Sequence, residues 1–538
     1  MAAAERLNSK WVAMAASIWI QCASGASYTF GIYSSVLKST QSYDQSTLDT
    51  VSVFKDIGAN AGVFSGLLYT AVTSHRCRLR GGGGPWVVLA VGAIQCFAGY
   101  FLMWAAVSGL IPRPPVPMMC LFMFLAAQSQ TFFNTANVVS AVENFADYGG
   151  TAVGIMKGFL GLSGAILIQL YETVCGGNPA SFILLLAITP ALLSLLAMPL
   201  VTIYETSNMD EKKHLGGISA ISLIIAAYLM AVIILKNTFG LSSWANIIAL
   251  VCLLVLLASP LLIARRAYRE SLENSLSPVQ SPLIGSPKPT TSSKKIPEED
   301  SQIEGHCNEN PVPNEESLNL LQAMRSVDFW LLFLAMICGM GSGLSTINNI
   351  RQIGESLRYS TIEINSLVSL WSIWNFLGRF GAGYASDVLL HRYGWPRPLL
   401  MATTLASMSI GHLIIASGFR GNLYIGSVIV GICYGSQWSL MPTITSELFG
   451  VRHMGTIFNT ISVASPVGSY IFSVRLIGYI YDKTASGTGH VCYGSRCFML
   501  SFVIMASVAL FSFLVACLLF YRTRTLYRQI VVKRLHRR

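Results

Sequence analysis

The sequence predicts an all-α, polytopic membrane protein, and three observations support this prediction. First, 53% of the 538 residues are hydrophobic and only 11% are charged, whereas soluble proteins carry roughly 25% charged residues. Second, apolar segments of about 20 residues, the length that a helix needs to cross a bilayer, recur along the whole chain. Third, basic residues gather in every second connection between these segments, as the positive-inside rule requires.

Fourteen segments are long and apolar enough to be membrane-spanning helices, and we number them as spans 1 to 14. They lie near residues 11–36, 50–73, 86–110, 116–140, 150–171, 180–203, 216–236, 243–264, 328–348, 363–385, 398–417, 422–445, 454–480 and 498–520. An even number of spans places both termini on one side of the membrane.

Basic residues identify that side as the cytoplasm. They are Arg6, Lys10, the cluster His75–Arg80, Lys212, Lys213, Arg265, Arg266, His391, Arg392, Arg397, Arg452 and the tail from Arg522 to Arg538. The opposite connections hold few basic residues, so the asymmetry predicts cytoplasmic termini. The net charge of +11 is then expected to face the anionic inner leaflet, and nucleic acid is not an expected partner.

Five segments make up the predicted domain organisation. Residues 1–204 form a first six-helix bundle, 205–264 two inserted helices, 265–326 a cytoplasmic linker, 327–520 a second six-helix bundle, and 521–538 a basic tail. The linker is rich in Ser, Pro, Glu and Lys, and it cannot bury enough apolar surface to fold alone. Its pairs Ser277-Pro278, Ser281-Pro282 and Ser286-Pro287 are either sites of proline-directed phosphorylation or parts of a solvated tether.

Weak internal similarity indicates two pseudo-symmetric halves, as transporters often have. The stretch Ser24–Thr29 in span 1 resembles Ser342–Ile347 in span 9. Likewise, Glu143-Asn144-Phe145 before span 5 resembles Glu447-Leu448-Phe449 before span 13. These matches preserve their order along the chain, so they predict two six-helix halves with spans 7 and 8 inserted between them.

A candidate gate motif follows span 10, where residues 378–387 read GRFGAGYASD. This stretch resembles the G-x-x-x-D-(R/K)-x-G-R-(R/K) loop of the major facilitator superfamily. The resemblance implies a cytoplasmic latch formed by Gly378, Arg379, Gly383, Asp387, Arg392 and Arg397. Glycine allows close helix approach, and Asp387 can accept hydrogen bonds from a basic group or a helix N-terminus. The alternative is a charge cluster that only sets topology. The first-half counterpart, from Gly62 to Arg80, lacks the acidic residue.

Span 5 carries a glycine pattern typical of helix packing. Gly150, Gly154 and Gly158 repeat every four residues, and Gly161 and Gly164 continue the series, which leaves one helix face flat. The core Gly-Ile-x-Lys-Gly-x-x-Gly-Leu-Ser-Gly resembles the plant nodulin-like branch of the major facilitator superfamily, the group that includes the nuclear-fusion-defective proteins. This resemblance covers nearly the whole chain and implies a membrane transport fold, but it does not define the substrate.

Lys157 is the main candidate for a solute-binding residue. It lies inside the apolar run from Thr151 to Leu170, and an ammonium group in hydrocarbon is costly unless it faces water, a partner or a substrate. Snorkelling toward the interface is the alternative. Further polar residues of apolar spans are candidates for the same pathway or for interhelical hydrogen bonds: Asn134, Asn137, Asn348, Asn349, Gln437 and Asn459.

The predicted function is therefore transport of a small solute by alternating access of two halves about a midplane site. A buried cation with few buried carboxylates favours an organic anion or a zwitterion. No G-x-x-x-x-G-K-[ST] loop is present, so transport is expected to be secondary or facilitative, with a possible coupling proton. The alternative is a transporter-like regulator or receptor that moves no solute.

Neither catalytic residues nor cofactors are predicted. The sequence has no H-x-x-x-x-D or H-E-x-x-H pair, which argues against a membrane acyltransferase or a zinc protease, and no metal site is expected. We expect a monomer in the plasma membrane or in a vacuolar or other endomembrane. Cys492 and Cys497 enclose a short outer loop and are either free thiols or a disulfide.

Overall fold

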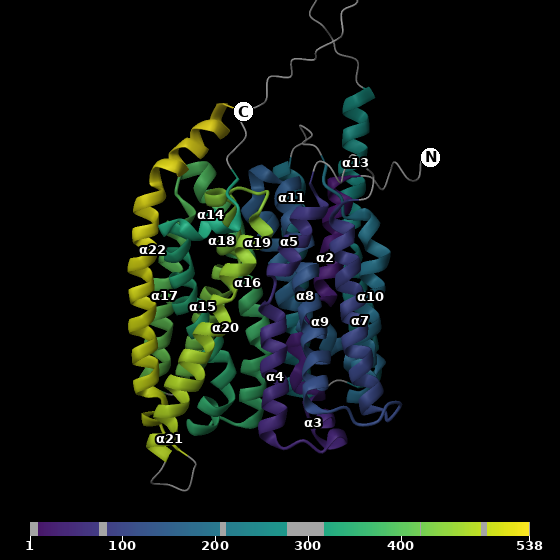
Figure 1. Cartoon of the computed structure of the whole chain (residues 1–538), viewed down its shortest axis with the longest axis vertical. Coiled ribbons are helices and arrows are strands. Elements are labelled where there is room, and N and C mark those ends of the chain that lie inside the picture. Colours follow the sequence, from purple (N-terminus) through teal and green to yellow (C-terminus); the bar gives the residue numbers. More distant parts are fainter. Residues whose placement is uncertain are drawn as a thin grey trace, which may run out of the picture.

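The computed structural model describes residues 9–74, 83–204, 211–240, 242–276, 317–419, 421–485 and 492–536. Within these ranges the chain is helical and contains no β-strand. Figure 1 shows long helices running roughly side by side, with both termini at one end of the molecule, which we call the terminus-bearing end. The basic cluster His75–Arg80 and the three Ser-Pro pairs of the linker lie outside the described residues.

The first half and the inserted helices extend to residue 276. Their elements are α2 Lys10–Ala23, η1 Ala26–Thr29, α3 Phe30–Gln41, α4 Gln45–Asn60, α5 Val63–Val72, α7 Pro85–Val107, α8 Val116–Asn144, η2 Ala146–Tyr148, α9 Gly149–Val174, α10 Pro179–Ala197, η3 Met198–Leu200, α11 Glu211–Phe239, α12 Ser243–Ala258 and α13 Pro260–Leu276.

The second half begins with α14. Its elements are α14 Leu320–Arg325, α15 Val327–Ser356, α16 Thr361–Tyr393, α17 Arg397–Ser417, α18 Asn422–Phe449, α19 Met454–Ser462, α20 Ala464–Ser469, the π-helix η4 Tyr470–Gly478, α21 Tyr479–Ala485 and α22 Arg496–His536. Local sequence explains the ends of α16: Ser360 and Glu363 form a capping box, and Gly394 ends the helix with a φ of 66°.

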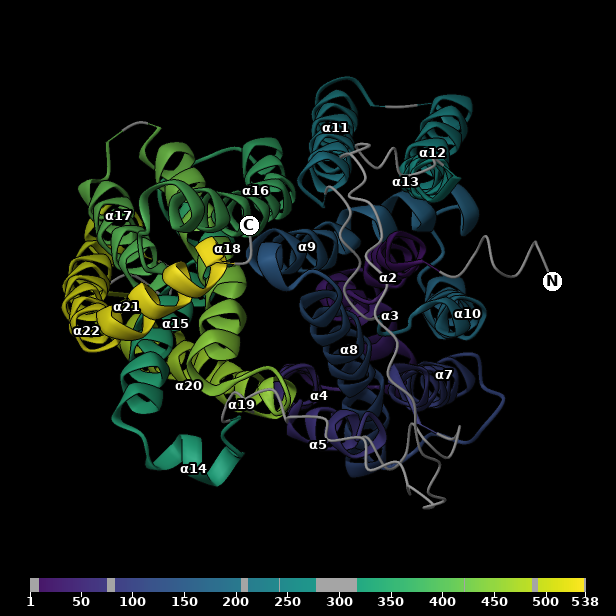
Figure 2. The same ribbon diagram turned by 90° about the horizontal axis from the view of Figure 1, so that it is seen from above.

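Seen from above, the two halves are separate bundles that meet along α9, α16, α18 and α19 (Figure 2). The inserted helices α11 to α13 lie at one flank, with α11 near both α9 and α16. The all-α, polytopic fold with two bundles is as predicted.

Ten helices in the described part of the chain are long and apolar enough to cross a membrane. The first two predicted spans are not among them, because each is interrupted: α2 ends before η1 and α3, and α4 ends before α5. The tenth and twelfth, α16 and α18, are helices of 33 and 28 residues, so their polar and aromatic content rather than their length sets them apart. The number fourteen stays a prediction.

The inserted helices are attached to the first half by charged groups. Lys10 of α2 forms a buried ion pair with Glu211 of α11, 2.5 Å apart, which joins the inserted group to the first half. Within the inserted group, Lys213 of α11 pairs with Glu270 of α13. The helix α13 continues to Leu276, so the first residues of the segment predicted as a disordered linker are helical. The Lys213–Glu270 pair holds this extension against α11, which composition alone does not reveal.

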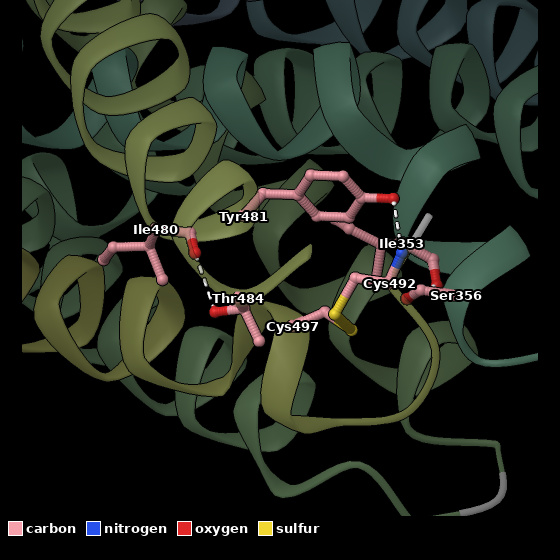
Figure 3. The surroundings of a disulfide bond; sticks show 7 residues. All are labelled: Ile353, Ser356, Ile480, Tyr481, Thr484, Cys492 and Cys497. Carbon is pink, nitrogen blue, oxygen red and sulfur yellow. Dashed lines mark hydrogen bonds between the residues drawn. A yellow bond between two sulfur atoms is a disulfide. The ribbon is translucent and has the colours of Figure 1, made fainter. Parts of the chain in front are cut away.

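At the end opposite the termini, Cys492 and Cys497 form a disulfide (Figure 3). It closes a loop of four residues at the start of α22. The backbone N–H of Cys492 donates to the Tyr481 hydroxyl at 3.2 Å, and the N–H of Gly494 donates to the carbonyl of Ser356 at 2.9 Å. Of the two alternatives left open by the sequence, the structure has the bonded one.

Candidate functional site

Near the terminus-bearing end, α9 of the first half packs against α16 of the second along the predicted glycine face. A β-carbon on Gly383 would lie 2.3 Å from the carbonyl oxygen of Gly150, and one on Gly154 would lie 3.1 Å from the carbonyl oxygen of Arg379. One turn further along, Gly158 contacts the ring of Phe376. Because both backbones approach so closely, only residues without a β-carbon allow this contact. We call this contact the α9–α16 seam.

Other glycines of the predicted set serve the same packing. Gly161 lies against the side chain of Arg379, Gly164 lies against Tyr28, and Gly378 lies against the backbone of Ile432 in α18. The glycine pattern thus positions α9 between the two halves.

Asp387 connects the halves at the N-terminus of α9. Its carboxylate accepts hydrogen bonds from the backbone N–H groups of Gly150 at 3.2 Å and Thr151 at 2.5 Å, and from the Thr151 hydroxyl at 2.7 Å. No side chain within α9 caps this helix, so a carboxylate from the other half satisfies its free N–H groups and opposes its dipole. Charge-assisted bonds of this kind are among the stronger hydrogen bonds of proteins.

Arg397 holds that carboxylate in place. Its Nη2 lies 2.7 Å from Asp387 Oδ1, and its Nε donates to both oxygens of Glu447 at 2.9 Å. Its Nη1 also donates to the Ser386 hydroxyl. Arg397 is 1% exposed and Asp387 2%, so a buried network of one cation and two carboxylates extends from the second half to the first.

A second contact joins the halves at the same end, between α5 and α19. A β-carbon on Gly66 would lie 2.4 Å from the backbone nitrogen of Thr456. Asn459 donates to the hydroxyl of Thr135 in the first half at 2.7 Å. The Thr70 hydroxyl is 3.4 Å from the carbonyl oxygen of Arg452. We call this contact the α5–α19 seam.

Lys157 lies deeper, eight residues into α9 or roughly 12 Å from its start. Its side chain is 1% exposed. The ammonium nitrogen is 5.2 Å from the centre of the Trp438 ring and 5.0 Å from that of Phe458, and both rings belong to the second half. These are cation–π contacts, which stabilise a charge less than a carboxylate does. Among the described residues, no hydrogen-bond acceptor or carboxylate contacts this nitrogen.

Arg379 shares the same aromatic face, with its guanidinium carbon 5.6 Å from the Trp438 ring. Its Nη1 donates to the backbone carbonyl of Lys157 at 2.9 Å, and its Nε donates to Asn375 Oδ1 at 2.9 Å. It is 1% exposed. The sequence assigned Arg379 to the gate motif, whereas the structure places it beside Lys157. Two basic side chains, one from each half, therefore share the Trp438 ring, and we call this pair with Trp438 the cation site.

Amide side chains of the same interior have unused hydrogen-bonding groups. Asn137 is fully buried, and neither of its amide atoms has a partner among the described residues. Gln437 donates to the Met408 sulfur at 3.3 Å and leaves its oxygen without a partner there. Asn134 accepts a long hydrogen bond from Gln21 at 3.5 Å. Buried amides are normally satisfied by protein, water or ligand, so these groups are available to a polar solute.

Three predicted residues lie elsewhere. Asn348 is exposed and donates to Ser469 at 3.3 Å, and Asn349 donates to Ser473 at 2.7 Å, so both are used within the second half. Arg392 is exposed at the end of α16, outside the Asp387–Arg397 network. The substrate and gate assignments of the predicted residues stay predictions.

Sequence reasoning missed Trp438, Phe458, Asn375 and Gln21, which surround the two cations or the amides. Gln21 and Asn375 carry the same signal as the predicted asparagines, because each is an amide in an apolar span. Trp438 and Phe458 carry none, because an aromatic residue in a membrane helix is indistinguishable from a packing residue.

A cavity of about 250 Å³ lies away from this interior, between α17 and α18. Its lining includes the hydroxyls of Thr403, Thr404 and Ser407, which donate to carbonyls of their own helix. Because those hydroxyls are already bonded, this cavity offers a solute less than the cation site does.

Two family models match successive parts of the chain. A family model described as Nodulin-like matches residues 10–265, and one described as NFD4, C-terminal domain, matches residues 314–529. The chain is 26% identical over 545 residues to Protein NUCLEAR FUSION DEFECTIVE 4 of Arabidopsis thaliana, covering 97% of this chain and 90% of that protein.

More distant similarities are to transporters. The chain is 27% identical over 205 residues to the Probable transporter MCH1 of Yarrowia lipolytica, which covers 36% of this chain and 42% of that protein. The solved structure of the proton:xylose symporter XylE superposes with a TM-score of 0.55 at 12% identity, covering 94% of each chain. This likeness establishes the fold. The chain is thus an integral, multi-pass membrane protein with the major facilitator fold, and it belongs to the nodulin-like, NFD4-type family.

Proposed function

We propose that this protein carries a small organic anion or zwitterion across the membrane by secondary or facilitated transport. The observation that carries the proposal is the cation site: Lys157 and Arg379 are each 1% exposed, share the Trp438 ring, and have no ion-pair partner among the described residues. A buried charge without a counter-charge is costly, so a solute that brings a negative group is the partner that best compensates it.

The position of the cation site suits alternating access. Lys157 comes from the first half and Arg379 from the second, so an anion that binds both also draws the halves together. Tyr28 lies beside Gly164, which is about 10 Å further from the terminus-bearing end than Lys157 is. Tyr28 is 49% exposed. This exposure supports entry of the solute from the opposite end while the two seams close the terminus-bearing one.

The Asp387–Arg397 network is proposed as the latch of that closed state. It connects the second half to the N-terminus of α9 in the first half. Opening the terminus-bearing end would break these bonds, and solute binding would supply compensating ones.

We propose that the terminus-bearing end faces the cytoplasm. Basic residues are concentrated there, and the Cys492–Cys497 disulfide lies at the opposite end, as expected of a surface outside the reducing cytosol. We further propose that the protein works as a monomer without catalytic activity.

Uptake into proteoliposomes tests this function. Radiolabelled lactate, malate and glutamate are the anionic and zwitterionic probes, and glucose and putrescine are the neutral and cationic ones. At least one of the first three is expected to accumulate. Lys157→Gln and Arg379→Gln should each reduce its uptake at least about tenfold, because each removes a charge-assisted contact. Lys213→Gln, which removes an exposed lysine of α11, is the matched control.

Two results would contradict the proposal. Transport of only the neutral or cationic probe would exclude an anion site. If none of the five moves, the transporter-like regulator or receptor becomes the better description.

A further inference from the structure

Lys157 and Arg379 differ in how their charges are held. The Arg379 guanidinium donates to Asn375 and to the Lys157 carbonyl at 2.9 Å each. The Lys157 ammonium, which has three N–H donors, is 5.2 and 5.0 Å from the centres of two aromatic rings. Arginine stays protonated in proteins, whereas a buried lysine readily loses its proton. Of the two cations, Lys157 is the one whose charge can change.

The elements packed against α9 offer Lys157 a second cation but no carboxylate at its own level. The facing group of α16 is the Arg379 cation. The facing groups of α18 and α19 are the uncharged rings of Trp438 and Phe458, with Tyr434 one turn before Trp438. Carboxylates of the elements that contact α9 lie near its two ends. These carboxylates are Glu143, Asp147, Glu211, Asp387 and Glu447 at the terminus-bearing end, and Glu172 and Glu363 at the other.

The remaining basic groups and tyrosines of these elements make no contact with the Lys157 ammonium among the described residues. They are Lys10 of α2, Tyr28 of η1, Tyr148 of η2, Tyr171 of α9, Lys212, Lys213, His214, Tyr228 and Lys236 of α11, Tyr384, His391, Arg392 and Tyr393 of α16, and Tyr424 of α18. Lys10 and Lys236 form ion pairs with Glu211 and Glu172. No group on these elements therefore balances a second positive charge beside Arg379.

We infer that Lys157 binds one proton each time an anion enters the cation site and releases it after the anion leaves, so that the protein is a proton–anion symporter. This inference rests on the proposed function. A proton from the water on the entry side forms the third N–H bond of the ammonium, and that bond breaks when the emptied site faces the other side.

Charge balance explains why this cycle is favourable. The empty site holds the Arg379 cation and a neutral Lys157 amine, so its net charge is +1. The loaded site holds two cations and one monovalent anion, and its net charge is again +1. The cation site therefore never holds two uncompensated charges while the two halves rearrange, which would be costly in a low-dielectric interior. Each cycle transfers one proton and one anion, and no net charge crosses the membrane.

Proton uptake on binding is the direct measurement. Calorimetric titration of the purified protein with lactate, malate and glutamate, in two buffers of different ionisation enthalpy, gives the protons bound per anion. The wild type is expected to take up about one proton per anion, by linkage. Lys157→Arg keeps the cation but cannot titrate. This variant should bind the anion without proton uptake, and its rate of anion transport into vesicles should not depend on a pH gradient.

If Lys157→Arg does not bind the anion, a second measurement, anion exchange across the vesicle membrane, tests the same inference. Exchange of labelled for unlabelled anion needs no net proton movement. Lys157→Gln should weaken exchange through the lost binding contact, but it should weaken uptake driven by a pH gradient much more, because that uptake also loses its proton carrier. Proton-driven uptake that persists in either variant would overturn the assignment of Lys157. Anion binding by the wild type without proton uptake would overturn the coupling but leave the proposed function intact, whereas no anion binding at all would remove both.

Discussion

The two seams at the terminus-bearing end are equivalent under the pseudo-symmetry of the halves, yet they are held by different forces. In the α9–α16 seam, Asp387 accepts three hydrogen bonds from Gly150 and Thr151. In the α5–α19 seam, Gly66 packs on the backbone of Thr456, and Asn459 makes a single bond to the other half. Both seams pack closely on glycine, but only the α9–α16 seam also holds a buried charge; the α5–α19 seam depends mainly on packing.

This difference follows from the sequence of each half. The second half carries Asp387 after its glycines, whereas the first-half counterpart beginning at Gly62 lacks an acidic residue. Close backbone contact is common to both seams, and the carboxylate is added in one of them. We therefore expect the α9–α16 seam to respond to loss of charge and the α5–α19 seam to respond to added volume.

Neutralising the charge should have the largest effect. Asp387→Asn removes the carboxylate that caps α9 and pairs with Arg397. Losing one partner of a buried pair costs roughly 3–5 kcal/mol, and since the amide keeps one acceptor oxygen we expect about 3 kcal/mol. The population of the closed state relative to the open state should therefore fall about 100-fold. Spin labels at the exposed positions Asp147 and Arg392 would report this as an increased distance.

The matched control is Asp482→Asn, which neutralises an exposed carboxylate on α21, away from both seams. It should leave the label distance unchanged. An unchanged distance in Asp387→Asn would mean that the capping bonds do not hold the halves together.

Adding volume should open the packed seam with a smaller effect. Gly66→Val places atoms within 2.4 Å of the Thr456 backbone nitrogen, and backbone cannot move aside as a side chain can. Overpacking of this kind costs about 1–3 kcal/mol. Labels at Ser74 and Arg452 should move apart. Gly31→Val is the control, since a β-carbon there meets nothing within 4 Å; equal shifts in both variants would show that valine acts on helix stability and not on the seam.

The sequence alone could predict features that are set by the residues of one helix. The glycine repeat of α9, the burial of Lys157 and the acceptor role of Asp387 all follow from spacing and residue type. Each needs only the fact that a polar or small residue stands in an apolar span.

Contacts between helices that are far apart in the sequence could not be predicted. Arg379 and Lys157 are 222 residues apart, and only the packing of α16 on α9 brings them together. Asn348 and Asn349 look like pathway residues in the sequence, but serines of η4 and α20 use their amides. The first two spans are interrupted near Gly25 and Ala61, although their composition is continuously apolar enough to suggest unbroken helices.

Acid should weaken the packed seam slightly, and this is the smallest expected effect. His453 lies in the connection before α19, next to Arg452, whose carbonyl meets Thr70 across the seam. Burial, and secondly the charge of Arg452, lower the pKa of His453 below its ordinary value of 6.5. The closed seam thus favours neutral His453, so its stability is complete above pH 6.5 and falls as the pH drops toward the lowered pKa.

The same label pair, at Ser74 and Arg452, would measure this effect between pH 7.5 and pH 5 in the absence of anion. The wild type should show a small rise in the open population at acid pH, limited by the partial exposure of His453. His453→Gln cannot be protonated and should lose that rise while keeping its distance at neutral pH. A rise of equal size in the variant would assign the pH response to another group, and a fall in the open population would contradict the sign derived from burial.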